Sequence, residues 1–356
     1  MRQVIIYATL LVALLVAAWL RWTAEPGADA DDVVVLLPGA AEDITAVTWK
    51  SKDDEVVFTR KSDAHGDYLW VEHTKWEEKP IAGPELPPDP AAPPQDPAVP
   101  SQDPAAPEPV VPVATERVAT RTLFKASAKG DELMASLGPL KAIRKLEATA
   151  EKLTEIGLDA PTETLVIERK GQAVTLDIGG EAYGTKDRYV RNQGTGEIFL
   201  VDDQILKNIS FARTRMQDRD LWSLARPAIA SIRVASADGR QVEMEQKNAD
   251  DEAAATWVRR GQETKDEAIT TWLDKALKLK GTSTVDLTAA DAPKDLQPRF
   301  TMTLTPSGKG KPETLEILQD GAEGDWYGRS EHTRATLKLL KAPTRAVNDD
   351  LAGLLQ

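Results

Sequence analysis

Residues 164–201 read TLVIERKGQAVTLDIGGEAYGTKDRYVRNQGTGEIFLV, and this stretch decides the fold class. It contains four short runs rich in apolar and β-branched side chains, at 164–168, 173–178, 188–191 and 197–201. A turn that contains glycine separates each run from the next, and glycine is the residue that tight turns favour. Short strands joined in this way are typical of antiparallel pairing. We therefore predict four consecutive antiparallel strands.

The chain on either side of this stretch extends the same pattern. Ahead of it, strands are expected at 44–49, 55–60 and 68–72, and helices at 131–137 and 149–156. After it, a helix is expected to begin near Asp202 or Asp203, because a carboxylate at the N-cap can accept backbone N–H groups. Its apolar face would carry Ile205, Leu206 and Ile209.

The second half of the chain repeats the order of these elements. A capping box at Thr264–Glu267 predicts a helix with Ile269, Leu273, Ala276 and Leu277 facing inward, and another helix is expected at 344–354. Strands are expected at 229–234, 241–245, 257–258, 299–304, 314–318, 325–329 and 336–339. We therefore predict an α+β fold of two tandem, related repeat domains with mainly antiparallel sheets, at 44–222 and 223–356.

A proline-rich tract interrupts the first of these domains. Between Pro80 and Pro112 lie thirteen of the 23 prolines of the chain, in an approximate seven-residue repeat. Because proline has no backbone N–H to donate, we expect a disordered, solvated insertion over 80–116. Trp70 is farther along the chain from its counterpart in the second half, Trp257, than Leu165 is from its counterpart, Phe300. The extra residues therefore lie between Trp70 and Leu165, which places the insertion inside the first domain. We favour a low-complexity insertion that the fold tolerates. The alternative is that this segment binds a partner or acts as a spacer.

The amino-terminal segment VIIYATLLVALLVAAWL, residues 4–20, is uncharged and lies between Arg2 and Arg21. At about 1.5 Å per residue it would span roughly 25 Å, slightly less than the ~30 Å core of a bilayer. A cleaved signal peptide is the alternative, but bulky residues follow the apolar run where a small-x-small site would stand. We expect a single-pass anchor at 1–22 and a juxtamembrane connection at 23–43. The flanking charges weakly favour the amino end inside, so the bulk of the chain is expected to be periplasmic or extracytoplasmic.

The composition excludes several classes of function. The net charge of −13 makes a nucleic-acid partner unfavourable, because the surface would repel phosphates. The absence of cysteine excludes disulfides, thiolate nucleophiles and cysteine-zinc sites. We expect no cofactor.

The motifs for catalysis and metal binding are weak. The three histidines, His65, His73 and His332, lack a metal-binding spacing, and a weak site at His65 and His73 is less favoured than surface positions. Residues 305–311 resemble a phosphate loop only superficially, and a hairpin turn is favoured there. The acidic clusters at 53–55 and 250–252 lack the spacing of a calcium loop. No Gly-x-Ser-x-Gly sequence is present. We expect no catalytic or metal-binding residues.

Two features are compatible with binding. The tryptophans Trp49, Trp70, Trp257, Trp272 and Trp326 would either pack in the core, which we favour, or line a groove for a glycan. The second feature is a set of arginines that could form a basic surface for an anionic partner: Arg188, Arg191, Arg213, Arg215 and Arg219.

Several motifs together resemble the domain of unknown function 4340 family. They are Glu155–Pro161, Ile178-Gly179, Arg188–Arg191, Ile198–Val201 and Arg219–Trp222. The resemblance implies a single-anchor bacterial membrane protein with extracytoplasmic repeats, of a kind often encoded beside ABC-transporter subunits of the gliding-motility type. The proline insertion departs from the usual pattern. In the second half, residues 292–296 replace the Gly-Leu-Asp-x-Pro motif.

From these observations we expect a non-enzymatic, membrane-anchored accessory or scaffold subunit of an ABC-type transporter complex. Its partners would be integral membrane transporter subunits, with an envelope component as a further possibility. A binding module for an envelope polymer such as a glycan is the first alternative. An envelope hydrolase is the second.

Overall fold

The structure is a computed structural model that describes residues 34–80, 115–249 and 255–355. The chain separates into two compact units, one of Met1–Thr45 with Glu132–Lys207 and the other of Ala46–Asp131 with Asn208–Gln356. This division differs from the boundary expected at 222/223, because the strands expected in the first domain are shared between both units. Within the described ranges, no helix has the length and hydropathy that crossing a bilayer requires. The expected anchor segment at 4–20 lies outside those ranges.

The first unit contains the four strands expected in residues 164–201, and all four are confirmed. With one further strand they pair antiparallel in the order β8-β9-β10-β11-β7. Their bounds are Glu163–Arg169 (β8), Gln172–Glu181 (β9), Arg188–Asn192 (β10), Ile198–Val201 (β11) and Arg144–Leu146 (β7). The turn between β8 and β9 has only two residues, Lys170 and Gly171, both with positive φ, as a mirror-image hairpin turn requires.

A short helix, α3 (Ala150–Glu155), packs against this ladder through two glycines of the family motifs. Gly157 has a φ of 70°, which ends the helix, and the backbone N–H of Gly180 donates to the Ile156 carbonyl at 2.7 Å. A Cβ on Gly179 would lie 2.5 Å from the same carbonyl oxygen. The glycines therefore allow the helix end and β9 to approach closely.

The expected connection at 23–43 is more structured than predicted. Strand β1 (Val34–Leu37) pairs antiparallel with β6 (Leu140–Ala142), and a 3₁₀ turn η1 (Ala41–Asp43) follows. Leu36 and Leu37 are buried. The described part of this segment is therefore part of the fold, because its apolar residues have a strand partner.

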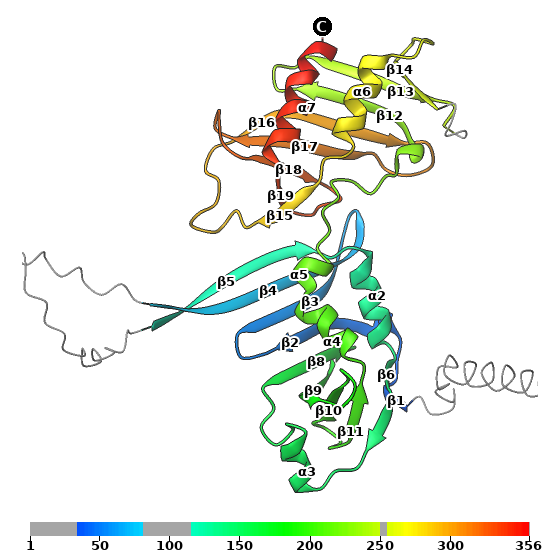
Figure 1. The fold of residues 1–356 in the computed structure, drawn as a ribbon. Coiled ribbons are helices and arrows are strands. Elements are labelled where there is room, and N and C mark those ends of the chain that lie inside the picture. The colour runs from blue at the N-terminus through cyan, green and yellow to red at the C-terminus, as the bar shows by residue number, and fades with distance from the viewer. Residues whose placement is uncertain (1–33, 81–114, 250–254, 356) are drawn as a thin grey trace, which may run out of the picture. The chain divides into compact units, whose positions relative to one another are not determined.

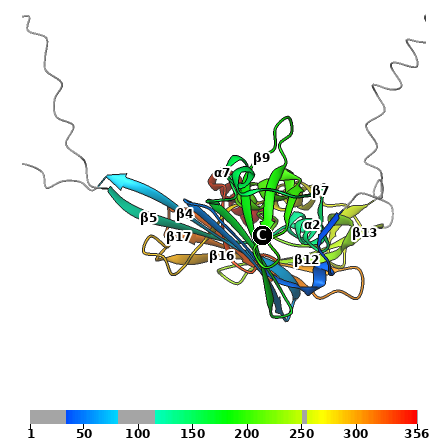
Figure 2. The ribbon, with the colours of Figure 1, turned by 90° about the horizontal axis from the view of Figure 1, so that it is seen from below.

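The second unit contains a ladder in the order β5-β4-β3-β2. Its strands are β2 (Ile44–Lys50), β3 (Asp54–Asp63), β4 (Gly66–Pro80) and β5 (Thr115–Lys125), and the first two residues of β2 fall in the first unit. Strands β4 and β5 form a long hairpin that pairs from Trp70 and Lys125 to Pro80 and Thr115, as Figure 2 shows. Residues 80, 115 and 116 of the expected insertion thus lie in strands, and residues 81–114 lie outside the described ranges.

An eight-stranded antiparallel sheet forms the rest of the second unit, in the order β14-β13-β12-β16-β17-β18-β19-β15. Two helices, α6 and α7, lie side by side on one of its faces (Figure 1). The strands are β12 (Ile229–Ser236), β13 (Gln241–Lys247), β14 (Thr256–Arg259), β15 (Gly281–Val285), β16 (Leu296–Pro306), β17 (Glu313–Asp320), β18 (Trp326–Ser330) and β19 (Thr336–Leu339). The helices of this unit are α5 (Ala212–Arg215), η2 (Arg226–Ala228), α6 (Glu267–Ala276) and α7 (Lys341–Leu354). Two further helices, α2 (Ala128–Leu137) and α4 (Asp203–Ser210), contain residues of both units.

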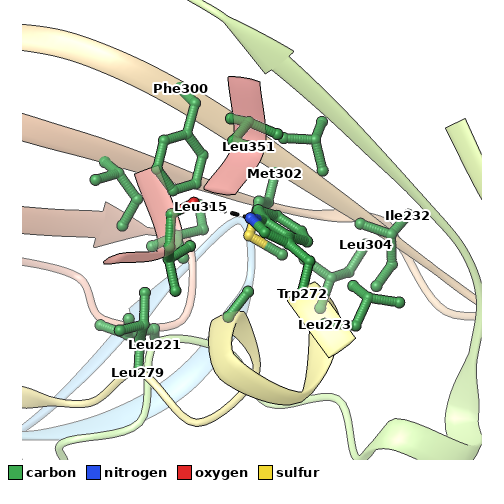
Figure 3. Close-up of a cluster of buried hydrophobic side chains, with 14 of the residues drawn as sticks. Leu221, Ile232, Trp272, Leu273, Leu279, Phe300, Met302, Leu304, Leu315 and Leu351 are labelled. Atoms are coloured by element: carbon green, nitrogen blue, oxygen red, sulfur yellow. Dashed lines mark hydrogen bonds between the residues drawn. The ribbon is translucent and has the colours of Figure 1, made fainter. Parts of the chain in front are cut away.

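The core of this sheet is organised around Trp272 on α6. Figure 3 shows its indole among Phe300, Met302 and Leu351, with the Nε1–H donating to the Val347 carbonyl of α7 at 2.8 Å. The rings of Trp272 and Phe300 meet edge to face, with centroids 6.3 Å apart. At about 25 cal/mol per Å², burial of a ring of roughly 200 Å² contributes about 5 kcal/mol before entropy costs. One side chain therefore joins both helices to the sheet.

One local prediction in this sheet was wrong, and one strand was missed. The N-cap of α6 is Asp266, whose carboxylate accepts the N–H groups of Ala268 and Ile269 at 3.0 and 3.1 Å, so the expected capping box at Thr264–Glu267 does not form. The backbone N–H of Asp266 donates to the Trp257 carbonyl, which fixes the helix start two residues later. Strand β15, which pairs with β19, was not predicted because Gly281–Val285 is short and polar.

Candidate functional site: a groove beside the β18–β19 turn

A groove of about 680 Å³ opens in the second unit. Apolar side chains from three strands and a loop line it, namely Trp70 on β4, Leu123 on β5, Val285 at the end of β15, and Leu287. Trp70 is half-buried, and Leu287 is 47% exposed. An open depression with an accessible indole and an exposed leucine is the kind of surface that binds another molecule.

Charged groups surround this apolar floor. Arg329 on β18 donates from Nε to Glu316 on β17 at 2.6 Å. The Glu331 carboxylate accepts the backbone N–H of Thr314 at 2.7 Å, and the Asp286 carboxylate accepts the N–H and hydroxyl of Thr288 at 2.9 and 2.6 Å. These hydrogen bonds, with the nearby charge of Arg121, lower the pKa of Asp286. Asp286 is therefore ionised at neutral pH.

One wall of the groove is the β18–β19 turn, residues 331–335. Its shape is fixed by Thr333, whose hydroxyl accepts the Ser330 N–H and donates its one hydrogen to the Ala335 carbonyl at 2.7 Å or to the Ser330 carbonyl at 3.1 Å. The hydroxyl of Ser330 donates to the Leu221 carbonyl at 2.6 Å. Arg334 has a φ of 56°, in the left-handed region that non-glycine residues seldom adopt. The turn is thus held in one conformation by its own hydrogen bonds.

Arg334 connects this turn to the β3–β4 hairpin. Its Nε lies 2.6 Å from Asp63 Oδ2, and its guanidinium lies 5.2 Å from the ring centroid of Tyr68. Tyr68 in turn meets Trp70 edge to face, with centroids 6.3 Å apart. Desolvation opposes ionisation of Asp63, but the His65 N–H and the Arg334 charge hold the pKa of this carboxyl below its ordinary value. The ion pair therefore also positions the aromatic residue of the groove.

His332, two residues earlier in the same turn, takes part in a second ionic cluster. Its Nε2 lies 3.0 Å from Asp218 Oδ2, and Lys125 Nζ donates to the same oxygen at 2.8 Å. The three side chains are only 15%, 12% and 14% exposed, in the order His332, Asp218 and Lys125. Burial raises the free energy of the Asp218 carboxylate, but hydrogen bonds from His332 and Lys125, together with their charges, hold its pKa well below the ordinary range. We call these three residues the ionic tie.

The arginines proposed as a partner surface are divided between the two units. In the first unit, Arg188 donates to the Gly179 carbonyl and to Glu163, and Arg191 donates to Asp177 at 3.0 and 2.6 Å. Both are engaged in contacts that hold β8, β9 and β10 together. Arg213, Arg215 and Arg219 belong to the second unit and are exposed. Arg215 contacts Asn208 and the ring of Phe211.

The histidines do not gather. His65 lies in the turn before β4 and His73 lies on β4, eight residues later, which is about 26 Å at roughly 3.3 Å per residue. His73 instead contacts Asp54 at 2.9 Å. Across the part of the chain that the structure describes, no group of three or more histidine or acidic side chains is arranged to hold a metal ion. The cluster at 250–252 lies outside that part.

Four of the five tryptophans confirm the prediction of core packing, and one does not. Trp49, Trp257, Trp272 and Trp326 are buried, so they do not form the exposed, coplanar surface that a glycan-binding module would use. Trp70 lines the groove instead. The flanking residues Leu69 and Val71 are buried, and this alternation is the signal that could have placed Trp70 on the opposite face of β4.

Of the ionic tie, only His332 was named in the sequence, as one of three histidines considered for metal binding, and no residue of the groove rim was singled out. Asp218 interrupts the basic run at 213–219, and an acidic residue in such a position is a weak signal of an internal ion pair. Lys125 and His332 have no comparable signal, because their partners are far away along the chain.

Comparison with known proteins agrees with the motifs in residues 155–222. No curated protein and no solved structure matches the chain. A family model described as a domain of unknown function, DUF4340, matches residues 126–298, from α2 into β16. Through this region, the chain is similar to the DUF4340 family.

Proposed function

We propose that the chain is a non-enzymatic, membrane-anchored accessory or scaffold subunit that uses the groove beside the β18–β19 turn as a binding surface. Its partners would be integral membrane subunits of an ABC-type transporter complex of the gliding-motility type. The anchor would be the apolar segment at 4–20, in a bacterial inner membrane, with the bulk of the chain in the periplasm. The family resemblance and the uncharged amino-terminal segment support this assignment.

The observation that carries the binding role is the groove itself. It combines an accessible indole, Trp70, with an exposed apolar side chain, Leu287, inside a rim of charged groups. The surrounding cations are engaged within the chain, since Arg329 binds Glu316 and Arg334 binds Asp63. A preformed apolar depression with fixed polar edges suits recognition of a partner.

We also propose that the chain contains two related repeats. Two sets of strand order support this proposal: β4-β3-β2 has the same order as β14-β13-β12, and β8-β9-β10-β11-β7 has the same order as β16-β17-β18-β19-β15. In the two five-stranded ladders, the last strand, β7 or β15, precedes the other four along the chain but pairs at the end of the ladder. The same unusual placement in both halves supports a common origin.

The proposal is tested by co-purification in a mild nonionic detergent. The native full chain is compared with a chain in which residues 4–20 are replaced by a generic apolar helix, and with the Trp70→Ala variant. Integral transporter subunits are expected to co-purify with the native chain and to be reduced in both variants. A Trp76→Ala variant is the control, because Trp76 lies on the same strand outside the groove. If no transporter subunit co-purifies with the native chain, the proposed assembly is wrong.

A further inference from the structure

We infer that the groove binds an extended apolar peptide segment that carries lysine or arginine. This inference rests on the proposed binding role of the groove and names the chemistry of its partner. The groove lies among strand ends of the second unit, where Leu123 of β5 and Val285 of β15 face the same space. An extended segment presents side chains alternately, so it can place apolar groups on such a floor and polar groups at the rim.

The apolar side chains define the first half of the recognition. Trp70, Leu123, Val285 and Leu287 supply a surface that is predominantly apolar, and Leu287 remains 47% exposed. The Trp70 ring has two neighbours within the chain, because Lys61 Nζ lies 5.3 Å from its centroid and Tyr68 meets it in a T-shaped contact. These contacts hold the indole in place, so binding a ligand costs little conformational entropy of the Trp70 side chain.

The charges define the second half. The lining contains three carboxylates and two guanidiniums. Arg329 is neutralised by Glu316, and Arg334 is neutralised by Asp63, which is not part of the lining. Asp286 and Glu331 are therefore left as an acidic excess. Two further cations are near the groove: Arg121 is itself bound to Glu72 by two hydrogen bonds of 2.5 and 2.7 Å, and Lys61 lies over the Trp70 ring. Even with the charge of Lys61 counted, the two carboxylates leave an excess of negative charge.

Both excess carboxylates have an oxygen available to a ligand. Thr288 binds Asp286 through Oδ1, and Thr314 binds Glu331 through Oε2. Among the described residues, no hydrogen bond reaches Asp286 Oδ2 or Glu331 Oε1. A lysine or arginine side chain would complete these two carboxylates with charge-assisted hydrogen bonds. The net charge of −13 also favours the approach of a cationic segment.

The test uses fluorine NMR on the full chain, labelled with 5-fluorotryptophan and kept in a nonionic detergent. Substitutions Trp70→Phe and Trp76→Phe assign the two resonances of interest. The probe is the peptide acetyl-Leu-Lys-Val-Leu-Lys-Val-amide, compared with its analogue in which glutamate replaces lysine. We expect the lysine peptide to shift the Trp70 resonance saturably and to leave Trp76 unchanged. The glutamate peptide should bind at least tenfold more weakly.

The charge requirement is tested with matched variants. Asp286→Asn combined with Glu331→Gln should weaken binding of the lysine peptide about tenfold, since two charge-assisted contacts are lost. Glu263→Gln combined with Glu267→Gln makes the same change of net charge at exposed positions outside the groove, and should change binding less than twofold. Equal weakening by both pairs would show that only long-range charge matters and would overturn the inference.

Other results would also overturn it. Equal shifts with the two peptides, no shift of Trp70, or equal shifts of Trp70 and Trp76 would each exclude a cation-selective peptide site in the groove. A shift of Trp70 without peptide, when residues 81–114 are replaced by a short Gly-Ser loop, would assign the groove to the chain's own segment. Because these measurements need no transporter, they separate the peptide chemistry from the proposed assembly. Loss of peptide binding with continued co-purification would leave the assembly standing.

Discussion

The second unit is held together in two different ways, by the apolar core around Trp272 and by the ionic tie of Lys125, Asp218 and His332. The core joins α6 and α7 to the sheet through many contacts, each of which is small and can be replaced by a similar one. The ionic tie joins residues from three distant segments through one carboxylate oxygen. The core therefore distributes stability over many residues, whereas the tie concentrates it in one.

This difference predicts different responses to substitution. Removing an apolar side chain leaves a cavity whose cost depends on how far the neighbours can relax. Removing Asp218 leaves the mostly buried Lys125 cation without its counter-charge and His332 without its hydrogen-bond partner, which costs more than the intact tie contributes. The following predictions are ordered from the largest expected effect to the smallest.

Trp272→Ala should lower the free energy of unfolding by about 4–5 kcal/mol, because it leaves a large cavity and removes the hydrogen bond to the Val347 carbonyl. The measurement is urea unfolding followed by circular dichroism. Trp272→Phe serves as the matched control, since it retains most of the ring and should cost about half as much. If Trp272→Ala lowers the free energy of unfolding less than Asp218→Asn does, the predicted order of the two effects is wrong.

Asp218→Asn should cost about 3 kcal/mol at pH 7, because Lys125 loses its buried counter-charge and His332 loses the carboxylate that it contacts. The folded-state pKa of Asp218 lies below that of an unfolded aspartate, about 3.9. Its contribution is therefore present above that pH and is lost as the pH falls through the folded pKa. Unfolding curves of the two proteins should converge progressively below pH 4. A constant difference down to pH 2 would contradict the assigned role.

Arg334 allows the ion pair to be separated from the backbone conformation. Arg334→Ala and Arg334→Gly both remove the contact with Asp63, but glycine adopts the φ of 56° without penalty. We expect Arg334→Gly to be more stable than Arg334→Ala by about 1 kcal/mol. Thermal unfolding of the pair measures this difference. Equal stabilities would mean that the turn changes conformation once the arginine is gone.

Arg121→Gln should cost no more than about 0.5 kcal/mol, although Arg121 and Glu72 form a two-hydrogen-bond pair with better geometry than the tie. The reason is exposure, since the side chains are 53% and 35% exposed. The urea midpoint at low and high salt measures the effect, which should shrink further as salt screens the charges. A cost comparable to that of Asp218→Asn would show that geometry outweighs burial.

The strands and helices were largely predictable because their signals are local. The turn glycines and the alternation in residues 164–201 define four strands correctly, and the order of elements after Ile229 follows in the same way. Strand β5 was missed because threonines and arginines dominate Thr115–Lys125, and because its partner β4 lies across residues 81–114. Edge strands often carry such charged side chains, which weakens their signal.

The groove and the ionic tie could not be predicted for a different reason. Their residues are brought together by the packing of strands that are far apart in the chain, as in the pair Lys125 and His332. No periodicity records which distant charge becomes the partner of another. Trp70 is the exception, since the burial of its neighbours Leu69 and Val71 follows from alternation along the strand.

The β4–β5 hairpin also makes the chain unusually easy to modify. Pairing holds Pro80 beside Thr115, so the ends of whatever joins them meet regardless of its length. Each doubling of the length of a flexible loop raises the free energy of closing it by only about 0.6 kcal/mol. Along β4, Pro80 lies about 33 Å from Trp70 at roughly 3.3 Å per residue. A fluorescent domain or an affinity tag inserted between Pro80 and Thr115 would therefore label the protein and leave the groove untouched.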